Sequence, residues 1–450
     1  MIEMLKANKA VLSLFQKKEL TENVKEFLEN FTDEEYCPLN IDVPLKHSMY
    51  NIVKHKGRTY IIYNTLFNSM ITLSDAEYVQ YQNIRFEDLS LVEYFTDNGF
   101  IIPECVDEYH HYYAYKNILN NQYSSESHYT IVLTSKCNAR CFYCYEEGVM
   151  QYDMSVETAD RIAELLYASD KPINITWFGG EPLLKADIID RITGILREKD
   201  HEFTSDIITN GSLITEEMIN VKFREWNIQW VQITLDGTKE EYMRRKCYYS
   251  NDADIYEKVL LNIDMMSKND IPVSIRLNID GDNALNCVSL SEYLKARYSD
   301  NKNISVYPAF LTDCGSHFND ESERLRYAGL IYDKYKPERS ILSSIPKLNS
   351  CYYQQKCSFV IDVDGSILCC ERDVGRQKTK LATVYSIESL DTLYKPEKIF
   401  PETKKICQKC VYYPKCLGGC IVAHSCKYEY DACFMERYKL EYLLDKIIDF

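Results

Sequence analysis

The sequence lacks any run of 18 uninterrupted apolar residues, the length at which a membrane-spanning helix becomes a candidate. Its first residues alternate charged and apolar side chains too quickly to form the apolar stretch of a signal peptide. Basic side chains are also outnumbered, 52 against 68, and the net charge of −16 repels phosphate backbones. These absences argue against a membrane protein, a secreted protein and a nucleic-acid-binding protein. We therefore expect a cytoplasmic chain.

Cysteine, in contrast, is abundant, with 18 in the chain. Structural disulfides do not persist in a reducing cytosol, so dense cysteine there indicates metal binding or redox chemistry. Scattered cysteines can also be buried thiols that act as small apolar side chains. The cysteines within 137–144 and 351–433 are too closely spaced for that explanation. We interpret both groups as metal ligands.

The chain divides into four regions. Residues 1–125 contain short β-type runs split at Gly57, followed by helix-like segments from near Asp75, which predicts a small winged-helix-like domain. Residues 126–310 alternate strand-like and helix-like segments six times, which predicts an α/β fold with a parallel sheet, a partial (β/α)6 TIM-like barrel. We assign residues 311–346 as a linker. Residues 347–450 are loop-rich and cysteine-dense, so bonds to metal must help that domain to fold.

The apolar runs and their spacing give the expected elements of the middle region. The expected strands are 129–134, 173–178, 206–209, 230–235, 273–279 and 304–310. The expected helices lie at 155–170, around 188–195, through 218–223, over 259–266 and near 290–297.

Three cysteines follow the first of these strands with the spacing C-x3-C-x2-C: Cys137, Cys141 and Cys144. Three thiolates on a four-iron cluster leave one iron without a protein ligand, as coordination of a substrate requires. Zinc usually takes a fourth protein ligand, and no histidine lies nearby in the sequence. Parallel βα folds place their active sites on the loops after the strands. We therefore predict a 4Fe-4S cluster with an open iron on this loop.

This loop, with the aromatic Tyr143 before its third cysteine, resembles the signature of the radical S-adenosylmethionine (SAM) superfamily. Further matches stand at the ends of the following strands: Gly179-Gly180-Glu181, Thr209-Asn210-Gly211 and Thr234-Leu235-Asp236-Gly237. Each of these short motifs alone is weak evidence, but their order along the strands supports the resemblance. It implies that Cys137, Cys141 and Cys144 carry the catalytic cluster. The SAM contacts that it implies are Tyr143, Gly179, Gly180, Glu181, Asn210, Thr234, Asp236, Arg276 and Asn278.

The C-terminal cysteines run Cys351-x5-Cys357, then Gly365 and Cys370, then Cys407-x2-Cys410-x5-Cys416-x3-Cys420, then Cys426 and Cys433. This layout resembles the SPASM extension of radical peptide-modifying enzymes. The resemblance implies two auxiliary 4Fe-4S clusters, three clusters in all. The first set of ligands would be Cys351, Cys357, Cys370 and Cys420, and the second Cys407, Cys410, Cys416 and Cys433. Two choices stay open, since Cys369 adjoins Cys370 and Cys426 competes with Cys433. On spacing alone, the run from Cys407 to Cys420 also fits a zinc site.

The resemblance implies that reduction of SAM yields a 5′-deoxyadenosyl radical, which takes a hydrogen atom from the substrate. We predict a maturase that installs thioether crosslinks in a ribosomal precursor peptide, of the sactipeptide or ranthipeptide type. The N-terminal domain would bind the leader of that peptide as an added strand, and a flavodoxin- or ferredoxin-type protein would donate electrons. The alternatives are an anaerobic sulfatase maturase and a non-catalytic multi-zinc protein.

Overall fold

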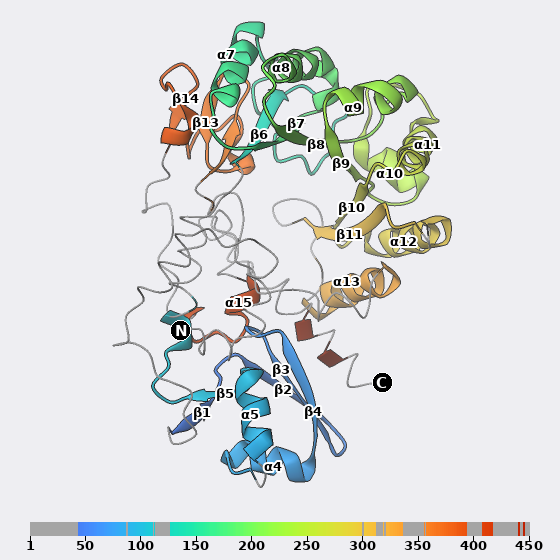
Figure 1. The fold of residues 1–450 in the computed structure, drawn as a ribbon. Helices are drawn as coiled ribbons and strands as arrows, with labels where there is room; N and C mark the ends of the chain where they lie inside the picture. Colours follow the sequence, from blue (N-terminus) through green and yellow to red (C-terminus); the bar gives the residue numbers. More distant parts are fainter. Residues whose placement is uncertain are drawn as a thin grey trace.

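The computed structural model describes residues 44–86, 89–110, 112, 127–298, 301–311, 318, 321–335, 355, 357–393, 407–416, 440–441 and 444–445. They form an N-terminal unit, a curved central sheet with helices on its outer side, and C-terminal segments that contact both (Figure 1). Within the described residues, no helix is both long enough and apolar enough to cross a membrane.

Six parallel strands stand side by side in the order of the sequence and form the arc in Figure 1. They are β6 (Ser127–Thr134), β7 (Ile173–Gly179), β8 (Phe203–Thr209), β9 (Ile228–Thr234), β10 (Val273–Ile279) and β11 (Ile304–Phe310). The predicted α/β fold is confirmed, and each strand overlaps its expected range.

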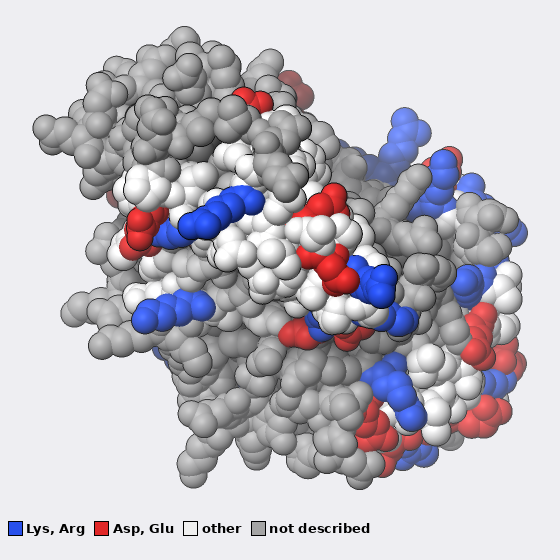
Figure 2. Space-filling model, turned by 90° about the horizontal axis from the view of Figure 1, so that it is seen from below, with Lys and Arg blue, Asp and Glu red and all other residues white. Residues whose placement is uncertain are grey.

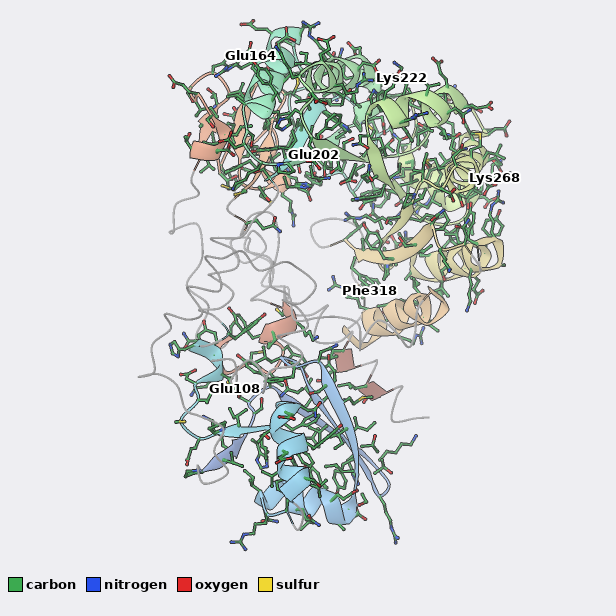
Figure 3. The ribbon with its side chains drawn as sticks, in the orientation of Figure 1. Glu108, Glu164, Glu202, Lys222, Lys268 and Phe318 are labelled. Carbon is green, nitrogen blue, oxygen red and sulfur yellow. The ribbon has the colours of Figure 1, made fainter. Side chains whose placement is uncertain are left out.

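Helices cover the outer side of the arc, and Figure 3 shows Glu164, Lys222 and Lys268 on them. The helical elements are α7 (Val156–Tyr167), η1 (Pro182–Lys185), α8 (Ala186–Glu198), η2 (Met218–Lys222), α9 (Phe223–Glu225), α10 (Lys239–Lys246), α11 (Ile255–Lys268), α12 (Ala284–Tyr298) and α13 (Glu321–Tyr335). The expected helices are all present. α10 and α13 were not expected.

Side chains alternate between the two faces of each strand, as strand geometry requires. On β7, Ile173, Ile175 and Trp177 are fully buried in the apolar core shared with the helices. The residues between them make polar contacts on the other face, where Thr176 Oγ1 lies 3.1 Å from His128 Nε2. Across the sheet, the Tyr307 hydroxyl donates to Gln232 Oε1 at 2.6 Å. The inner face of the arc therefore carries polar groups, beside an apolar cluster that includes Val132 of β6 and Phe178 of β7.

The sheet continues beyond β6 into the cysteine-rich region. β12 (Ser358–Ile361) pairs parallel with β6, and β13 (Ser366–Leu368) and β14 (Ala382–Thr383) follow antiparallel. Two short 3-10 helices, η4 (Glu371–Asp373) and η5 (Leu390–Thr392), lie in the same region. Arg161 on α7 donates to the carbonyls of Val384 and Ile387 at 3.0 and 2.6 Å. The boundary expected at residue 347 therefore does not separate two sheets, because part of the C-terminal region extends the central one.

The N-terminal unit is built on an antiparallel sheet of β2 (Asn51–Lys56), β3 (Thr59–Asn64) and β4 (Ser69–Ser74). β1 (Leu45–His47) pairs with β5 (Ile101–Pro103), and the helices are α4 (Asp75–Asn83) and α5 (Leu89–Asp97). Gly57 has φ +62° in the β2–β3 turn, a conformation that glycine adopts without strain. Ser74 and Glu77 form a capping box at the start of α4. The strand and helix order expected for this unit is confirmed.

Two C-terminal elements, η7 (Cys407–Lys409) and α15 (Tyr413–Cys416), lie against the N-terminal unit. Figure 3 shows Glu108 beside them. Seen from below, the described surface carries acidic and basic side chains interspersed among uncharged ones (Figure 2).

Candidate active site

The cysteine loop after β6 is held by backbone contacts with the segment after β7. The Gly180 amide donates to the Thr134 carbonyl, and the Glu181 amide to the Lys136 carbonyl, both at 2.9 Å. A Cβ on Gly179 would come within 2.2 Å of the Thr134 oxygen, and one on Gly180 within 2.4 Å of the Lys136 oxygen. Glycine is therefore required at both positions because two backbones meet there.

The Gly180→Ala variant should lower the midpoint of thermal unfolding, since the new methyl group meets a backbone carbonyl that cannot move alone. We expect a loss of about 1–3 kcal/mol. Gly194→Ala is the matched control: nothing lies within 4 Å of its Cβ position in α8, and it should stabilise the chain by up to about 1 kcal/mol. Equal midpoints for the two variants, measured by circular dichroism, would show that the close approach costs nothing.

Glu181 ties the ends of β7 and β8 together. It is fully buried, and its carboxylate accepts hydrogen bonds from Thr209 Oγ1 at 2.7 Å, the Asn210 amide at 2.9 Å and the Leu183 amide at 3.1 Å. Burial raises the pKa of Glu181 above its usual range. The carboxylate therefore accepts its hydrogen bonds from protein groups, and these bonds hold the loops around the site in place.

A second link joins the cysteine loop to the end of β8. The Asn210 side chain donates to Asn138 Oδ1 at 2.7 Å, and Asn138 donates to Ser212 Oγ at 2.9 Å. Asn138 follows Cys137 directly, so this chain of side-chain bonds sets the position of the first cysteine. Cys137, Gly180 and Asn210, which the sequence analysis grouped together, are therefore connected in the structure.

Tyr143, Asp236 and Lys246 form a buried polar group beside the loop. The Tyr143 hydroxyl donates to Asp236 Oδ2, and Lys246 Nζ lies 3.3 Å from the same oxygen and 3.1 Å from the hydroxyl. Burial would lower the pKa of Lys246, but Asp236, Tyr143, Cys141 and Tyr242 together more than offset it, and the pKa lies well above its usual value. The ammonium is therefore charged. Within the described structure, Asp236 Oδ1 is buried with no hydrogen-bond partner, which leaves an acceptor for a bound group.

The three thiols have the chemistry that a cluster needs. Burial raises the pKa of Cys137 to about 12 and that of Cys144 to about 11, so these two thiols hold their protons until a metal displaces them. The Lys246 charge lowers both pKa values and favours the thiolates. The described residues contain no group of three His, Cys, Asp or Glu side chains arranged around a single ion. A four-iron cluster would bind each thiolate at a different iron, and its assignment to these three cysteines stays a prediction from the sequence.

The remaining expected contacts lie on β9 and β10. Thr234 stands opposite Arg276 in the sheet register, and Arg276 Nε donates to Asn278 Oδ1 at 3.0 Å. Two acidic side chains also face this region: burial raises the pKa of Glu371, which the Arg276 charge opposes, and raises that of Glu146 to about 7. Glu146 Oε2 has no hydrogen-bond partner in the described part of the chain. The polar inner face thus carries charge of both signs.

Of the expected auxiliary ligands, Cys351, Cys420 and Cys433 lie outside the described residues, as does the competing Cys426. Cys357 precedes β12 and Cys370 follows β13, and the antiparallel pairing brings both to the same end of that hairpin. Lys171 Nζ lies 3.5 Å from the Cys357 sulfur. Cys369 is fully buried and Cys370 half-buried. Cys407 begins η7, Cys416 ends α15, and Cys410 lies between the two elements.

Two site residues were missed from the sequence, Arg245 and Lys246. Both are buried at the end of α10, where Arg245 forms two hydrogen bonds with Asp280, at 3.2 and 2.9 Å, and lies over the Phe142 ring. The sequence feature that could have indicated these two residues is the basic run Arg244-Arg245-Lys246, shortly after the Asp236-Gly237 motif. A basic run at a helix end more often faces solvent, so the pattern alone did not reveal burial.

Comparison with known proteins identifies part of the central region. Residues 131–285 match the family model of the radical SAM superfamily, so this part of the chain is a radical SAM domain, the domain shared by a superfamily of enzymes that use SAM. The resemblance identified from the cysteine loop is therefore confirmed.

Relatives and solved structures extend the likeness. The chain is 22% identical to the cysteine-type anaerobic sulfatase-maturating enzyme of Clostridium perfringens over 365 residues, 70% of this chain and 95% of the relative. The structure of anSMEcpe with bound AdoMet and Cp18Cys peptide matches with a TM-score of 0.57 and 20% identity, covering 72% of this chain and 98% of that one. Streptococcus suis SuiB bound to precursor peptide SuiA matches with a TM-score of 0.50 and 16% identity, covering 87% and 100%. These identities establish the fold alone. Two other curated relatives are matched over 58% and 51% of their length, so the chain spans about half of each.

Proposed function

We propose that this chain is a radical SAM enzyme that installs thioether crosslinks in a ribosomally made precursor peptide. The observation that carries the radical chemistry is the cysteine loop tied through Gly180 and Asn138 to the ends of β7 and β8, beside the charged Lys246. Cys137, Cys141 and Cys144 would hold the 4Fe-4S cluster. When bound, the cluster and SAM together supply the 5′-deoxyadenosyl radical that takes a hydrogen atom from the peptide.

The protein groups would position the reactants. Lys246 offers a fixed positive charge to an anionic group, and Asp236 Oδ1 offers a buried acceptor to a hydroxyl or amine. The polar inner face between β6 and β11 would hold the peptide segment to be modified. The apolar outer face of the central sheet packs under the helices and has no part in the chemistry. Holding both partners in one orientation is the main contribution that the protein makes to a radical reaction.

The N-terminal sheet supports peptide recognition. Among the described residues, β4 pairs with β3 on one side only, and Thr72 and Ser74 on it are exposed. On the opposite edge, Lys54 of β2 forms ion pairs with Glu441 and Asp445, at 2.9 and 2.8 Å, so C-terminal residues lie there. An extended leader peptide would therefore add to β4, where main-chain hydrogen bonds supply affinity. SuiB was solved with its precursor peptide, which makes a peptide substrate reasonable for this fold.

Incubating the reconstituted protein with reductant, SAM and the short cysteine-containing peptide encoded beside its gene should give a product lighter by about two hydrogens per crosslink, because each thioether removes one S–H and one C–H hydrogen. Mass spectrometry after thiol alkylation checks the result, since a crosslinked cysteine no longer reacts. Omitting SAM is the control. Cofactor cleavage with no change in peptide mass would contradict the proposal.

The sulfatase-maturating relative favours a second candidate, oxidation of a cysteine side chain to an aldehyde. The same reaction distinguishes the two, because an aldehyde is labelled by a hydrazide reagent and a thioether is not. The two auxiliary clusters and a flavodoxin- or ferredoxin-type donor complete the proposed machinery. Auxiliary clusters would accept the electron left when the crosslink forms.

A further inference from the structure

The loop after Cys144 carries two buried polar atoms that no protein group satisfies. The Tyr145 hydroxyl and Glu146 Oε2 are both buried, and neither has a hydrogen-bond partner among the residues that the structure describes. The hydroxyl can donate a hydrogen bond, and the carboxylate oxygen can accept one. Buried polar atoms without partners are costly and rare in native proteins, so a neighbouring pair of them calls for an explanation.

Tyr145 and Glu146 lie on the inner side of the arc. The Tyr145 ring packs against the apolar cluster that includes Val132 of β6 and Phe178 of β7. Burial raises the pKa of Tyr145 well above its usual value, and the carboxylates of Glu146 and Glu371 raise it further, so these groups are neighbours. The Tyr145 hydroxyl therefore keeps its proton and acts as a donor.

Two strands of the central sheet face the same region. Arg276 of β10 lies opposite Tyr307 of β11 in the sheet register. Burial raises the pKa of Tyr307 and that of Glu371, and the Arg276 charge lowers both. The Arg276 charge also lowers the pKa of Tyr145. Residues from β10, β11, η4 and the loop after Cys144 therefore surround one polar region, on the face where the proposed function places the peptide.

Contacts with the C-terminal region hold this loop in place. Arg376 donates to the Tyr145 carbonyl. A Cβ on Gly375 would come within 2.2 Å of Val149 Cγ1, so the two segments are closely packed. The Gly375 amide donates to Asp362 Oδ2 at 2.8 Å, which ties this contact to the residue after β12. The loop is therefore held at both of these points, and its two unsatisfied atoms are fixed in position before a ligand binds.

We propose that Tyr145 and Glu146 form a subsite for the backbone of the substrate peptide, in which the Tyr145 hydroxyl donates to a main-chain carbonyl and Glu146 Oε2 accepts from a main-chain N–H. In an extended chain, the N–H and C=O of one residue point to the same side, so a single peptide residue can satisfy both atoms. This inference rests on the peptide substrate of the proposed function. Because the backbone is the same at every residue, the subsite accepts peptide residues with different side chains.

Thermal unfolding of the reconstituted full chain without peptide separates this role from a structural one. Tyr145→Phe removes a hydroxyl that bonds to no described residue, so its unfolding midpoint should equal or exceed that of wild type. Tyr298→Phe is the matched control: that buried tyrosine donates to Asp264 Oδ1 at 2.7 Å, and its loss should lower the midpoint. A lower midpoint for Tyr145→Phe would overturn the proposal, because the hydroxyl would then be bonded within the protein.

Peptide binding measures what the two side chains contribute. The probe is the short cysteine-containing peptide encoded beside the gene, labelled with a fluorophore, and its dissociation constant is measured by anisotropy under anaerobic conditions with SAM omitted. Tyr145→Phe and Glu146→Met should each raise the dissociation constant about tenfold, and Tyr298→Phe should leave it unchanged. Wild-type affinity in both site variants would show that neither side chain contacts the peptide.

N-methylation of the peptide, one residue at a time, identifies the group that Glu146 contacts. At one position the methyl group should weaken binding to wild type about tenfold but leave binding to Glu146→Met unchanged, since that variant has already lost the bond. If no position behaves in this way, or if only a side-chain replacement does, the backbone assignment is wrong. A peptide that does not bind wild type would refute the peptide substrate and this subsite together. A peptide that binds with these dependences but is not crosslinked would refute the crosslinking alone.

Discussion

The Cys141→Ala variant is expected to produce no detectable 5′-deoxyadenosine, a loss of at least about a thousandfold. Two thiolates on a four-iron cluster leave two irons without protein ligands, and such a cluster is not retained. Iron bound by the reconstituted protein should fall by about four per chain while the proposed auxiliary clusters remain. Because Cys141 is only partly buried, its removal should change the unfolding midpoint little. Liquid chromatography of the nucleoside products, with iron analysis of the same sample, checks the prediction.

Cys247→Ala is the matched control for this loss. Its thiol is exposed, and it lies next to the site because the Arg140 amide donates to the Cys247 carbonyl at 3.0 Å. Its sulfur contacts the Arg244 carbonyl, so it is not one of the loop ligands. The variant should cleave SAM at the wild-type rate. If Cys141→Ala kept its iron and its nucleoside product, the three-cysteine assignment would be wrong.

The parts of the fold that depend on local sequence were predictable. Strand β7 alternates apolar residues with Asn174 and Thr176 and ends at the first of two glycines, and helix α8 repeats isoleucine at helical spacing, so both could be located from the sequence. The cysteine loop was predictable for the same reason, since Cys137, Cys141 and Cys144 are close in sequence. The structure adds the long-range bonds that hold that loop, such as the one from Asn210 to Asn138.

Other features depend on contacts that no local pattern contains. β12 has four residues and β14 two, and they are strands because β6 has an open edge to which β12 adds. From their own sequence, the segments of β12 and β14 are predicted to be loops. The burial of Lys246 also depends on distant contacts, because Asp236 and Tyr143, which lie on other segments of the chain, contact its charged group. Pairing of residues from distant segments is decided by the tertiary fold, and one sequence does not reveal it.

Arg245 should be among the most sensitive positions for stability. Its side chain is fully buried, as is that of Asp280, and the two make a two-bond ion pair between α10 and the end of β10. The Arg245→Met variant keeps most of the side-chain volume but leaves the Asp280 carboxylate buried without its cation. Breaking a buried pair in this way costs about 3–5 kcal/mol. Urea unfolding followed by circular dichroism should show that loss.

The Arg191→Met variant provides the surface comparison. Arg191 pairs with Asp160 between α8 and α7, but both side chains are more than a third exposed, so the loss should stay below about 1 kcal/mol.

The double variant Arg245→Met with Asp280→Asn should recover part of the stability, because asparagine carries no charge and its oxygen can still accept from the Asn283 amide, 3.2 Å from Asp280 Oδ1. The guanidinium also lies 4.7 Å from the Phe142 ring, so Arg245→Met should lower iron retention as well as stability. If the single variant unfolds at the wild-type urea concentration, the pair is not a buried ion pair in solution.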